Sequence, residues 1–392
     1  MENLALYFDY AATTPVDERV IEVMVQCLGR TGTFGNPASS SHGYGRQARS
    51  AVDIARQQVA DLIGAQPQQI IWTSGATESN NLALKGVAHS YAQRHQGAKG
   101  HIITSQIEHK AILDTAAQLQ EEGVDVTYLA PDANGLIGVE AVLGALRDDT
   151  FLVSLMVVNN ELGTLNDIGL IGQRVREHGA LFHVDAAQGA GKVGIDLSEL
   201  AVDLMSFSAH KIYGPKGIGA LYVGPRADQR IAAQIHGGGH ENGLRSGTLA
   251  THQIAGMGAA FALAQQLFEE EGEQIRRLNQ RLCSLLADVP GLRINGDAHQ
   301  RIPHTLSLTF GSNDLDFNVL GHGIAFSSTS ACNSAKNTPS HVLLALGHDA
   351  KAASQTIRLS LGRFTSEDDI DRAARLIKAA RVQPAFWAVA QP

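Results

Sequence analysis

Short apolar runs alternate with helical patterns along more than half of the chain, and this alternation constrains the fold more than any other feature. Between about Pro15 and His240, runs such as "QIIWTSG", "HIITSQ", "FLVSLMVV" and "ALFHVDAA" are typical of buried strands, and helical patterns follow them. A chain that alternates in this way forms a mostly parallel sheet with helices on both faces. We therefore predict an α/β domain.

The segments around this region complete the expected architecture. Pro15 suits the first turn of a helix that carries Cys27 inward, and a second helix is expected from near Gly43 to Leu62, before Gly64. "VDLMSFSAHK" and "GIGALYVG" lie close together in the sequence and are expected to pair as an antiparallel edge.

A change of pattern marks the last third of the chain. A long helix is expected from about Thr251 to Leu286, as the link to a second domain. "TLSLTF" and "TIRLSLG" are predicted strands, and Ser366 is the expected cap of a final helix with an acidic first turn. This part is predicted to be an α+β domain.

Composition narrows the class of protein. The chain has 392 residues, enough for two domains, and its formal charge of −8 argues against nucleic acid as the main ligand. No basic segment followed by an apolar run opens the sequence, and no apolar stretch reaches membrane-spanning length. We expect a cytoplasmic protein that binds no membrane.

The 3 cysteines do not form a disulfide framework. Cys27 and Cys283 lie in helical patterns and are interpreted as packing residues. No CxxC motif is present, and His236 and His240 in "HGGGHENG" lack a third ligand at the usual spacing, so no metal site is predicted. Cys332 is different, because "SSTSACNSAKN" has the composition of a loop.

Polar residues follow the apolar runs at the points where the strands should end. These are "TSGATES", "QIEHK", "VNNELG", "HVDAAQ" and "SFSAHK". In open α/β sheets the ligand lies beyond the carboxyl ends of the strands, so these five segments are expected to converge.

Lys211 is the most suggestive residue of these segments. It follows a predicted buried strand, and a desolvated lysine has a lowered pKa and becomes an amine nucleophile suited to imine formation. The alternative is a partly exposed lysine at a turn. Its neighbours Ser208 and His210 could hold a phosphate.

Other strand ends supply complementary groups. Asp185 could pair with a protonated ring nitrogen or could cap a helix, and Gln188 could donate to a ring oxygen. His109 could stack on a planar ligand or move protons, or could be structural. "TSGATES", with Thr77, could bind phosphate at a helix start or could be an ordinary cap. Together these are the parts of a pyridoxal phosphate site.

Six longer segments resemble one family. "SFSAHKIYGPKGIGALYV", "TSGATESNNLALKG", "HVDAAQ", "VNNELG", "HGGGHENGLRSGT" and "SSTSACNSA" resemble the cysteine desulfurases of the NifS/IscS type, in the class V branch of fold-type I pyridoxal-phosphate enzymes. The resemblance implies a mostly parallel seven-stranded sheet in a large domain, residues 16–262. It also implies a smaller α+β domain, residues 1–15 and 263–392, that carries the cysteine loop.

The resemblance implies roles for particular residues. Lys211 would form the imine with pyridoxal phosphate, His109 would stack on the ring and assist proton transfer, and Asp185 and Gln188 would pair with the ring nitrogen and the phenolic oxygen. The resemblance also implies the phosphate ligands Ala76, Thr77, Ser208 and His210, and Thr248 from the neighbouring subunit of a homodimer. The substrate carboxylate would be bound by Arg358, Asn36 and Asn160. Asn160 would also contact the cofactor.

For Cys332 the resemblance implies attack on the sulfur of L-cysteine, release of alanine and a persulfide handed to an acceptor protein. Thr329 and Asn333 depart from the usual loop "SSGSACTS", which bears on how the loop moves. Relatives carry a longer tail after "AFWAVAQP" that helps to dock the iron–sulfur scaffold, so the acceptor stays open. The sulfur could supply iron–sulfur cluster biogenesis, tRNA thiolation or DNA modification.

Other functions stay open from the residues. Selenocysteine lysis or another class V reaction would use the same cofactor, although transamination needs no loop cysteine. A catalytically idle sulfur-relay scaffold is a further alternative. A nicotinamide-linked enzyme is disfavoured, because no GxGxxG lies between a strand and a helix.

Overall fold

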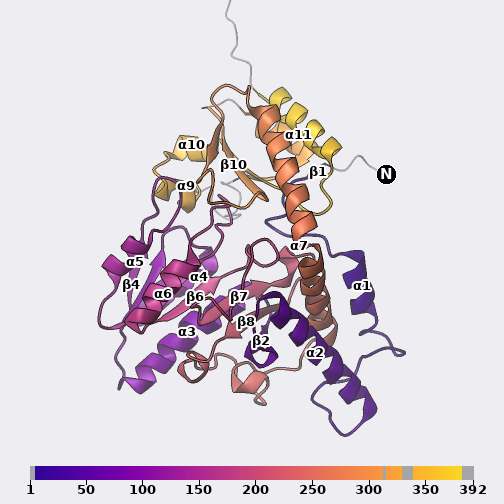
Figure 1. Ribbon diagram of the computed structural model, residues 1–392, viewed down its shortest axis with the longest axis vertical. Coiled ribbons are helices and arrows are strands. Elements are labelled where there is room, and N and C mark those ends of the chain that lie inside the picture. Colours follow the sequence, from indigo (N-terminus) through magenta and orange to yellow (C-terminus); the bar gives the residue numbers. More distant parts are fainter. Residues whose placement is uncertain (1–4, 312–314, 329–338, 382–392) are drawn as a thin grey trace, which may run out of the picture.

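The computed structural model describes residues 5–311, 315–328 and 339–381. Its main feature is a seven-stranded sheet, as predicted, and Figure 1 shows this sheet below a smaller one. Along the large sheet the strands are β2 (Ile70–Thr73), β8 (Gly219–Val223), β7 (Leu204–Ser208), β6 (Leu181–Asp185), β5 (Thr150–Met156), β3 (His101–Ser105) and β4 (Asp125–Leu129).

The prediction of an antiparallel edge is half right. Strands β7 and β8 do pair antiparallel, but β8 is not the edge, because β2 pairs antiparallel with its other side. The contacts between β3, β4, β5, β6 and β7 are all parallel. Since β2 and β7 both run antiparallel to β8, β2 points the same way as the parallel strands.

Helices cover both faces of the large sheet, as the burial of alternate strand residues requires. Ile71, Ile102 and Leu152 face one layer, whereas Trp72 and Val153 face the other. The first layer holds α3 (Ala76–Arg94) and α4 (Lys110–Glu121). The second holds α1 (Glu18–Val25), α2 (Gly43–Leu62), α5 (Val139–Ala145), α6 (Ile168–His178) and part of α7 (Thr251–Leu286).

Helix α1 is shorter than predicted. It begins at Glu18 rather than at Pro15, because Asp17 is its cap. The Asp17 side chain accepts a hydrogen bond from the Arg19 amide, and the Asp17 amide donates to the Tyr213 carbonyl at 3.0 Å, which holds Asp17 in an extended conformation.

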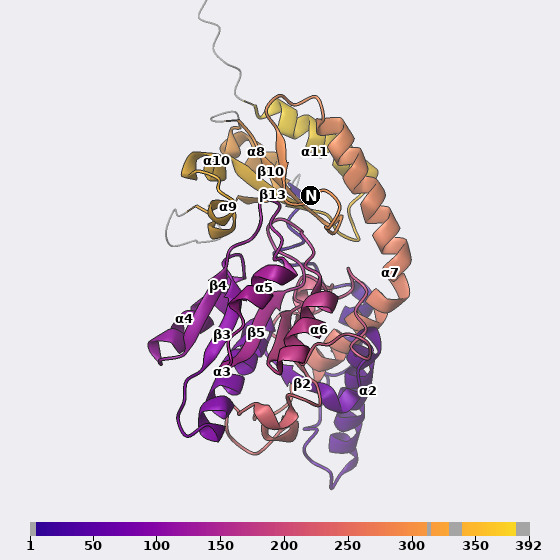
Figure 2. The ribbon, with the colours of Figure 1, turned by 60° about the vertical axis from the view of Figure 1, so that its left-hand side comes forward.

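The long helix α7 serves two hydrophobic cores. Its first half, including Ile254 and Phe261, packs on the large sheet, and its second half, including Ile275 and Leu282, packs in a separate cluster around the small sheet. Figure 2 shows it running along one side of the molecule between the two sheets. The predicted division at 262/263 falls inside this helix and stays a prediction.

All strand pairs of the small sheet are antiparallel. It has the order β12 (Ser327–Ser328), β13 (Thr356–Ser360), β10 (Thr305–Thr309) and β9 (Arg293–Asn295), and a separate parallel pair joins β1 (Leu6–Tyr7) to β11 (Ile324–Ala325). The helices of this part are α8 (Phe317–Gly323), α9 (His341–Ala345), α10 (Ala350–Ser354) and α11 (Glu367–Ala379). Ser366 caps α11, as predicted, and the structure adds a capping box with Asp369.

Of the helices in the described residues, none combines the length and the apolar character that crossing a lipid bilayer requires.

Candidate active site

A cavity of about 880 Å³ lies where the strands of the large sheet end. Each of the five predicted strand ends contributes to its lining, as the rule for open sheets requires. The predicted residues found there are Ala76, Thr77, His109, Asn160, Asp185, Gln188, Ser208, His210, Lys211 and Arg358. Residues that are hundreds of positions apart in the sequence therefore share one chamber.

Lys211 lies at the end of a 3-10 turn that follows β7. Its ammonium group donates to the carbonyl oxygens of Ala11 and Ala12, at 2.6 and 2.7 Å. These carbonyls belong to the N-terminal segment, which crosses the cavity after β1. The contacts hold the amine inside the cavity, where a carbonyl compound can reach it.

Asp185 is the last residue of β6 and is buried. Its Oδ2 accepts a hydrogen bond from Asn80 Nδ2 at 2.7 Å, and its Oδ1 accepts from the Ala187 amide at 2.9 Å. These two hydrogen bonds fix the orientation of the carboxylate, which can pair with a protonated ring nitrogen.

His109 caps the start of α4, where its Nδ1 accepts a hydrogen bond from the Ala111 amide at 3.1 Å. In the neutral ring the proton must then be on Nε2. Burial lowers the pKa of His109; the Asp185 carboxylate opposes this shift, while the Lys211 charge adds to it. The imidazole is therefore mostly uncharged at neutral pH.

The start of α3 is built to hold an anion. Its cap is Gly75, with φ of 155°, and no side chain in the described residues caps this helix. A Cβ on Gly75 would point toward Ser208 Oγ, 3.8 Å away, and would occupy the hollow between β7 and the helix start. Open amides at a helix start attract phosphate.

His210 borders the same hollow. Its Nδ1 lies 3.1 Å from Thr13 Oγ1, and burial together with the Lys211 charge lowers its pKa to about 4. A neutral His210 can donate a hydrogen bond to an anion but adds no charge.

Arg358 enters the cavity from β13 of the small sheet and is buried. Its guanidinium donates to the Asn160 carbonyl at 2.9 Å, to Asp9 Oδ1 at 2.9 Å and to Ser327 Oγ at 2.8 Å. Its Nε and the Asn160 Oδ1 are buried without a hydrogen-bond partner among the described residues. Such orphaned polar atoms indicate a ligand.

Four further lining or adjoining residues were not found from the sequence: Asn80, Glu108, Glu161 and His341. Glu108 is fully buried beside His109, and burial raises the pKa of its carboxyl to about 8. His341 Nε2 lies 2.9 Å from the Glu108 carbonyl oxygen, and Ser340 donates to Glu161. Glu108 and Glu161 lie in the strand ends "QIEHK" and "VNNELG", and His341 is a titratable residue close to Cys332, so these three carry a sequence signal.

Two predicted residues do not line the cavity, and a third lies outside the described residues. Asn36 and Thr248 are exposed on the surface of the single chain. Cys332 falls in the segment 329–338, together with Thr329 and Asn333. The described residues on either side of that segment reach the site, because Ser327 contacts Arg358 and Ser340 lines the cavity.

Comparison with known proteins gives consistent results. The family model of the class-V aminotransferases matches residues 6–373. A cysteine desulfurase IscS from Pseudomonas entomophila is 56% identical over 374 residues, which cover 95% of this chain and 92% of the relative.

Solved structures agree with this match. A NifS-like protein superposes with a TM-score of 0.87 at 37% identity and covers 96% of this chain and 99% of its own. A structure of SspA in complex with cysteine has a TM-score of 0.80 at 40% identity, over 92% of this chain and 99% of its own.

Proposed function

The chain belongs to the class-V aminotransferase family and is a cysteine desulfurase of the NifS/IscS type; from this premise we propose which residues bind the cofactor and the substrate and which one accepts the sulfur. The observation that carries the proposal is the convergence of Lys211, Asp185, His109 and Arg358 on one cavity.

We propose pyridoxal 5'-phosphate as the cofactor, and the donor set of the cavity fits it. Lys211 supplies the amine, Asp185 the fixed anion for the ring nitrogen, and Gln188 an amide for the ring oxygen. The start of α3, with Ala76, Thr77, Ser208 and His210 around it, fits the phosphate. When bound, this cofactor withdraws electrons from the α-carbon of an attached amino acid.

Arg358 is proposed to bind the carboxylate of L-cysteine. Its Nε, buried without a partner among the described residues, and its fixed guanidinium offer a charge-assisted contact inside a protected site. Asn160 lies beside it, and the Oδ1 of Asn160 is also buried without a partner among the described residues. Asn160 would contact the carboxylate end of the substrate. Asn36 would have to reach this end from the surface.

His109 is proposed to move protons near the reacting atoms. Burial lowers its pKa and keeps the ring neutral, and the Ala111 amide at Nδ1 leaves the proton on Nε2. A neutral imidazole acts as a base, so the ring would take up a proton and return it from the imidazolium form. The nearby Glu108 carboxyl, which is mostly protonated at neutral pH, keeps a second negative charge away from this region.

Cys332 is proposed to accept the sulfur. Its thiolate attacks the substrate sulfur, an S–S bond forms and the C–S bond breaks; the electron pair stays with the carbon skeleton, which takes up a proton and leaves as alanine. Cys332 follows Ser328 by four positions, so their Cα atoms are at most about 14 Å apart. Ser327, next to Ser328, contacts Arg358, and this length of chain allows the thiol to reach the substrate.

A homodimer is proposed, because Thr248 is exposed in the single chain and would complete the phosphate site of a second copy. The persulfide would be passed to an acceptor protein.

Product analysis tests the proposal. Purified protein with pyridoxal phosphate, L-cysteine and a thiol reductant is expected to yield alanine and sulfide. The Cys332→Ser variant should bind the cofactor and release no sulfide, whereas the control Cys283→Ser, altered in α7, should behave as the wild type. Normal sulfide release by Cys332→Ser would refute the role of Cys332. Faster turnover of selenocysteine would favour a lyase, and a protein that takes up no cofactor would favour a scaffold.

A further inference from the structure

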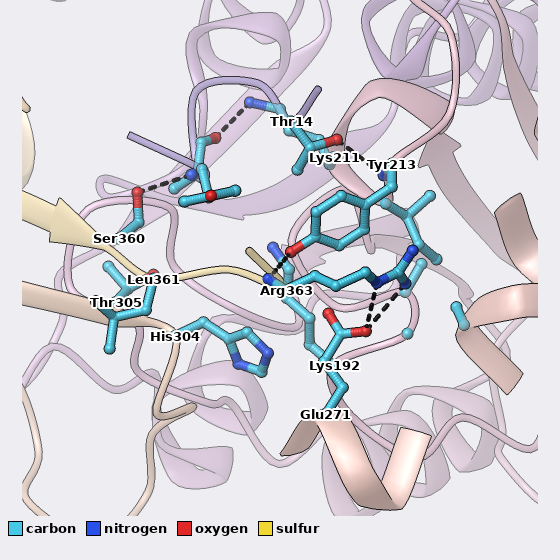
Figure 3. Close-up of a pocket in the computed structure, with 16 residues that line it drawn as sticks. Thr14, Lys192, Lys211, Tyr213, Glu271, His304, Thr305, Ser360, Leu361 and Arg363 are labelled. Atoms are coloured by element: carbon cyan, nitrogen blue, oxygen red, sulfur yellow. Dashed lines mark hydrogen bonds and ion pairs between the residues drawn. The ribbon is translucent and has the colours of Figure 1, made fainter. Parts of the chain in front are cut away.

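A second lysine lies behind Lys211. Lys192 is partly buried and lines, with Lys211, a small closed cavity of about 10 Å³, room for about one water. Figure 3 shows Lys192, Lys211, Glu271 and His304 around this space. The reaction proposed above makes no use of Lys192.

The ammonium group of Lys192 has one polar contact of interest. Its Nζ donates to Gln188 Oε1 at 2.8 Å. No carboxylate in the described part of the chain lies within ion-pair distance of it, and Glu271, which lines the same small cavity, is paired with Arg363 at 2.9 Å. Burying an amine without an ion pair costs free energy, so a purely structural reason to keep Lys192 is weak.

Two contacts fix the direction of the Gln188 amide. An ammonium group can only donate and a carbonyl can only accept, so Lys192 must face Oε1 and the Ala11 carbonyl, 2.7 Å away, must face Nε2. A flipped amide would oppose donor to donor and acceptor to acceptor. The second N–H of Nε2 is then left for an acceptor in the large cavity that Gln188 lines.

The backbone around Lys192 is equally fixed. Gly191 has φ of 68°, and a Cβ there would lie 2.7 Å from Ile212 Cδ1. The turn between β6 and Lys192 is closed by bonds from the amides of Gly189 and Ala190 to the Ala186 carbonyl. The backbone that carries Lys192 is therefore fixed beside Gln188.

We propose that Lys192 is a positioning residue for the cofactor: it locks the Gln188 amide so that an N–H, and never the carbonyl, faces the ring oxygen. The inference rests on the proposed function. Burial and the Lys211 charge lower the pKa of Lys192 to about 7, with Glu271 opposing and Arg358 and His304 as further neighbours. The ammonium form can only donate, whereas the neutral amine also has a lone pair that can accept, so the lock is strongest below about pH 7 and weaker above it.

A double-mutant cycle tests this role. Lys192→Met, Gln188→Ala and the double variant are compared for the dissociation constant of pyridoxal phosphate and for the pH midpoint of its visible absorbance when bound. Lys192→Met is expected to weaken binding about tenfold, in line with a hydrogen bond to a charged group. It should also raise the midpoint, because the deprotonated ring oxygen loses a donor. Gln188→Ala should raise it too.

Non-additivity decides the outcome. In the Gln188→Ala background, Lys192→Met should change the dissociation constant less than about threefold, since there is no amide left to orient. The cofactor-free Lys192→Met protein should have a melting temperature no lower than that of the wild type. The control Lys378→Met, on the exposed part of α11, should change neither the dissociation constant of the cofactor nor the pH midpoint of its absorbance. An additive cycle or an unchanged midpoint overturns the role of Lys192. A wild type that binds no pyridoxal phosphate contradicts the proposed function and this inference together.

Discussion

The Asn80 side chain donates a hydrogen bond of 2.7 Å to the Asp185 carboxylate, across 105 positions of sequence, and both residues are buried. Asn80 belongs to α3, whose start is the proposed phosphate site, and Asp185 ends β6. One helix therefore serves the phosphate end and, through Asn80, the ring end of the proposed cofactor site.

Replacing Asn80 should weaken cofactor binding without abolishing it. In Asn80→Ala, Asp185 loses a donor to its ionised form, and a hydrogen bond to a charged group is worth about 1.5–3 kcal/mol, so we expect a dissociation constant at least about tenfold higher. Titration of the cofactor-free protein measures it. Asn134→Ala, in an exposed turn, is the control. Equal affinity in Asn80→Ala and the wild type would contradict this role.

Glu108 should make the protein less stable as the pH rises. Its folded pKa of about 8 lies above the unfolded value of 4.5, so the unfolded chain releases the proton first and stability falls between these two values. Glu108→Gln cannot ionise at this position. Its free energy of unfolding should therefore rise relative to that of the wild type by up to about 1.4 kcal/mol per pH unit in this range. Denaturant unfolding at pH 5, 6.5 and 8 tests the trend. A difference that stays constant with pH would refute it.

Arg358 should matter more for substrate than for cofactor. Arg358→Lys keeps the charge but loses the planar fork, so kcat/KM for L-cysteine should fall about 10–100-fold, while the cofactor dissociation constant changes little. Steady-state kinetics and cofactor titration separate the two. The guanidinium also holds Asp9 and Ser327, so the melting temperature of the variant is measured alongside. An unaltered KM would argue against carboxylate binding.

Arg363 should be a strong determinant of stability. It pairs with Asp17 at 2.8 Å and Glu271 at 2.9 Å, lies over the Tyr213 ring at 4.0 Å, and is mostly buried. Arg363→Met leaves buried carboxylates without this partner, so we expect a loss of about 3 kcal/mol in the free energy of unfolding. Denaturant unfolding measures the loss. Arg276→Met, whose partner Glu273 is exposed, should cost less than about 1 kcal/mol.

The ion pair between Asp17 and Arg363 predicts how the stability of the protein changes in acid. The Arg19 and Arg363 side chains hold the pKa of Asp17 well below its usual range. The stability from Asp17 is therefore present above pH 4 and is lost as the pH falls further. In Arg363→Met the loss of stability between pH 4 and pH 2 should be smaller than in the wild type, measured by denaturant unfolding. A steeper loss would contradict the assignment.

Local patterns in the sequence predicted most of the elements. Helix α2 and helix α7 have the predicted bounds, because amphipathic periodicity over 20 and 36 residues is a strong signal. Helix α1 was misplaced, since its start depends on Tyr213, almost 200 positions away. The edge of the large sheet was also misplaced, because strand order depends on which distant strand covers β8 and not on the sequence of β8 itself.

The sequence by itself determined the chemistry available: the amine of Lys211 and the carboxylate of Asp185, placed by the alternation of strands and helices, and the guanidinium of Arg358, indicated by the family resemblance. The tertiary structure alone decided what holds them. Ala11 binds Lys211, Asn80 binds Asp185, and Lys192 orients Gln188, through contacts that no periodicity encodes. The physical reason is the distance along the chain over which each signal extends. The periodicity of hydrophobic residues reflects the structure of a single helix or strand, whereas a hydrogen bond joins any two groups that packing brings within about 3 Å.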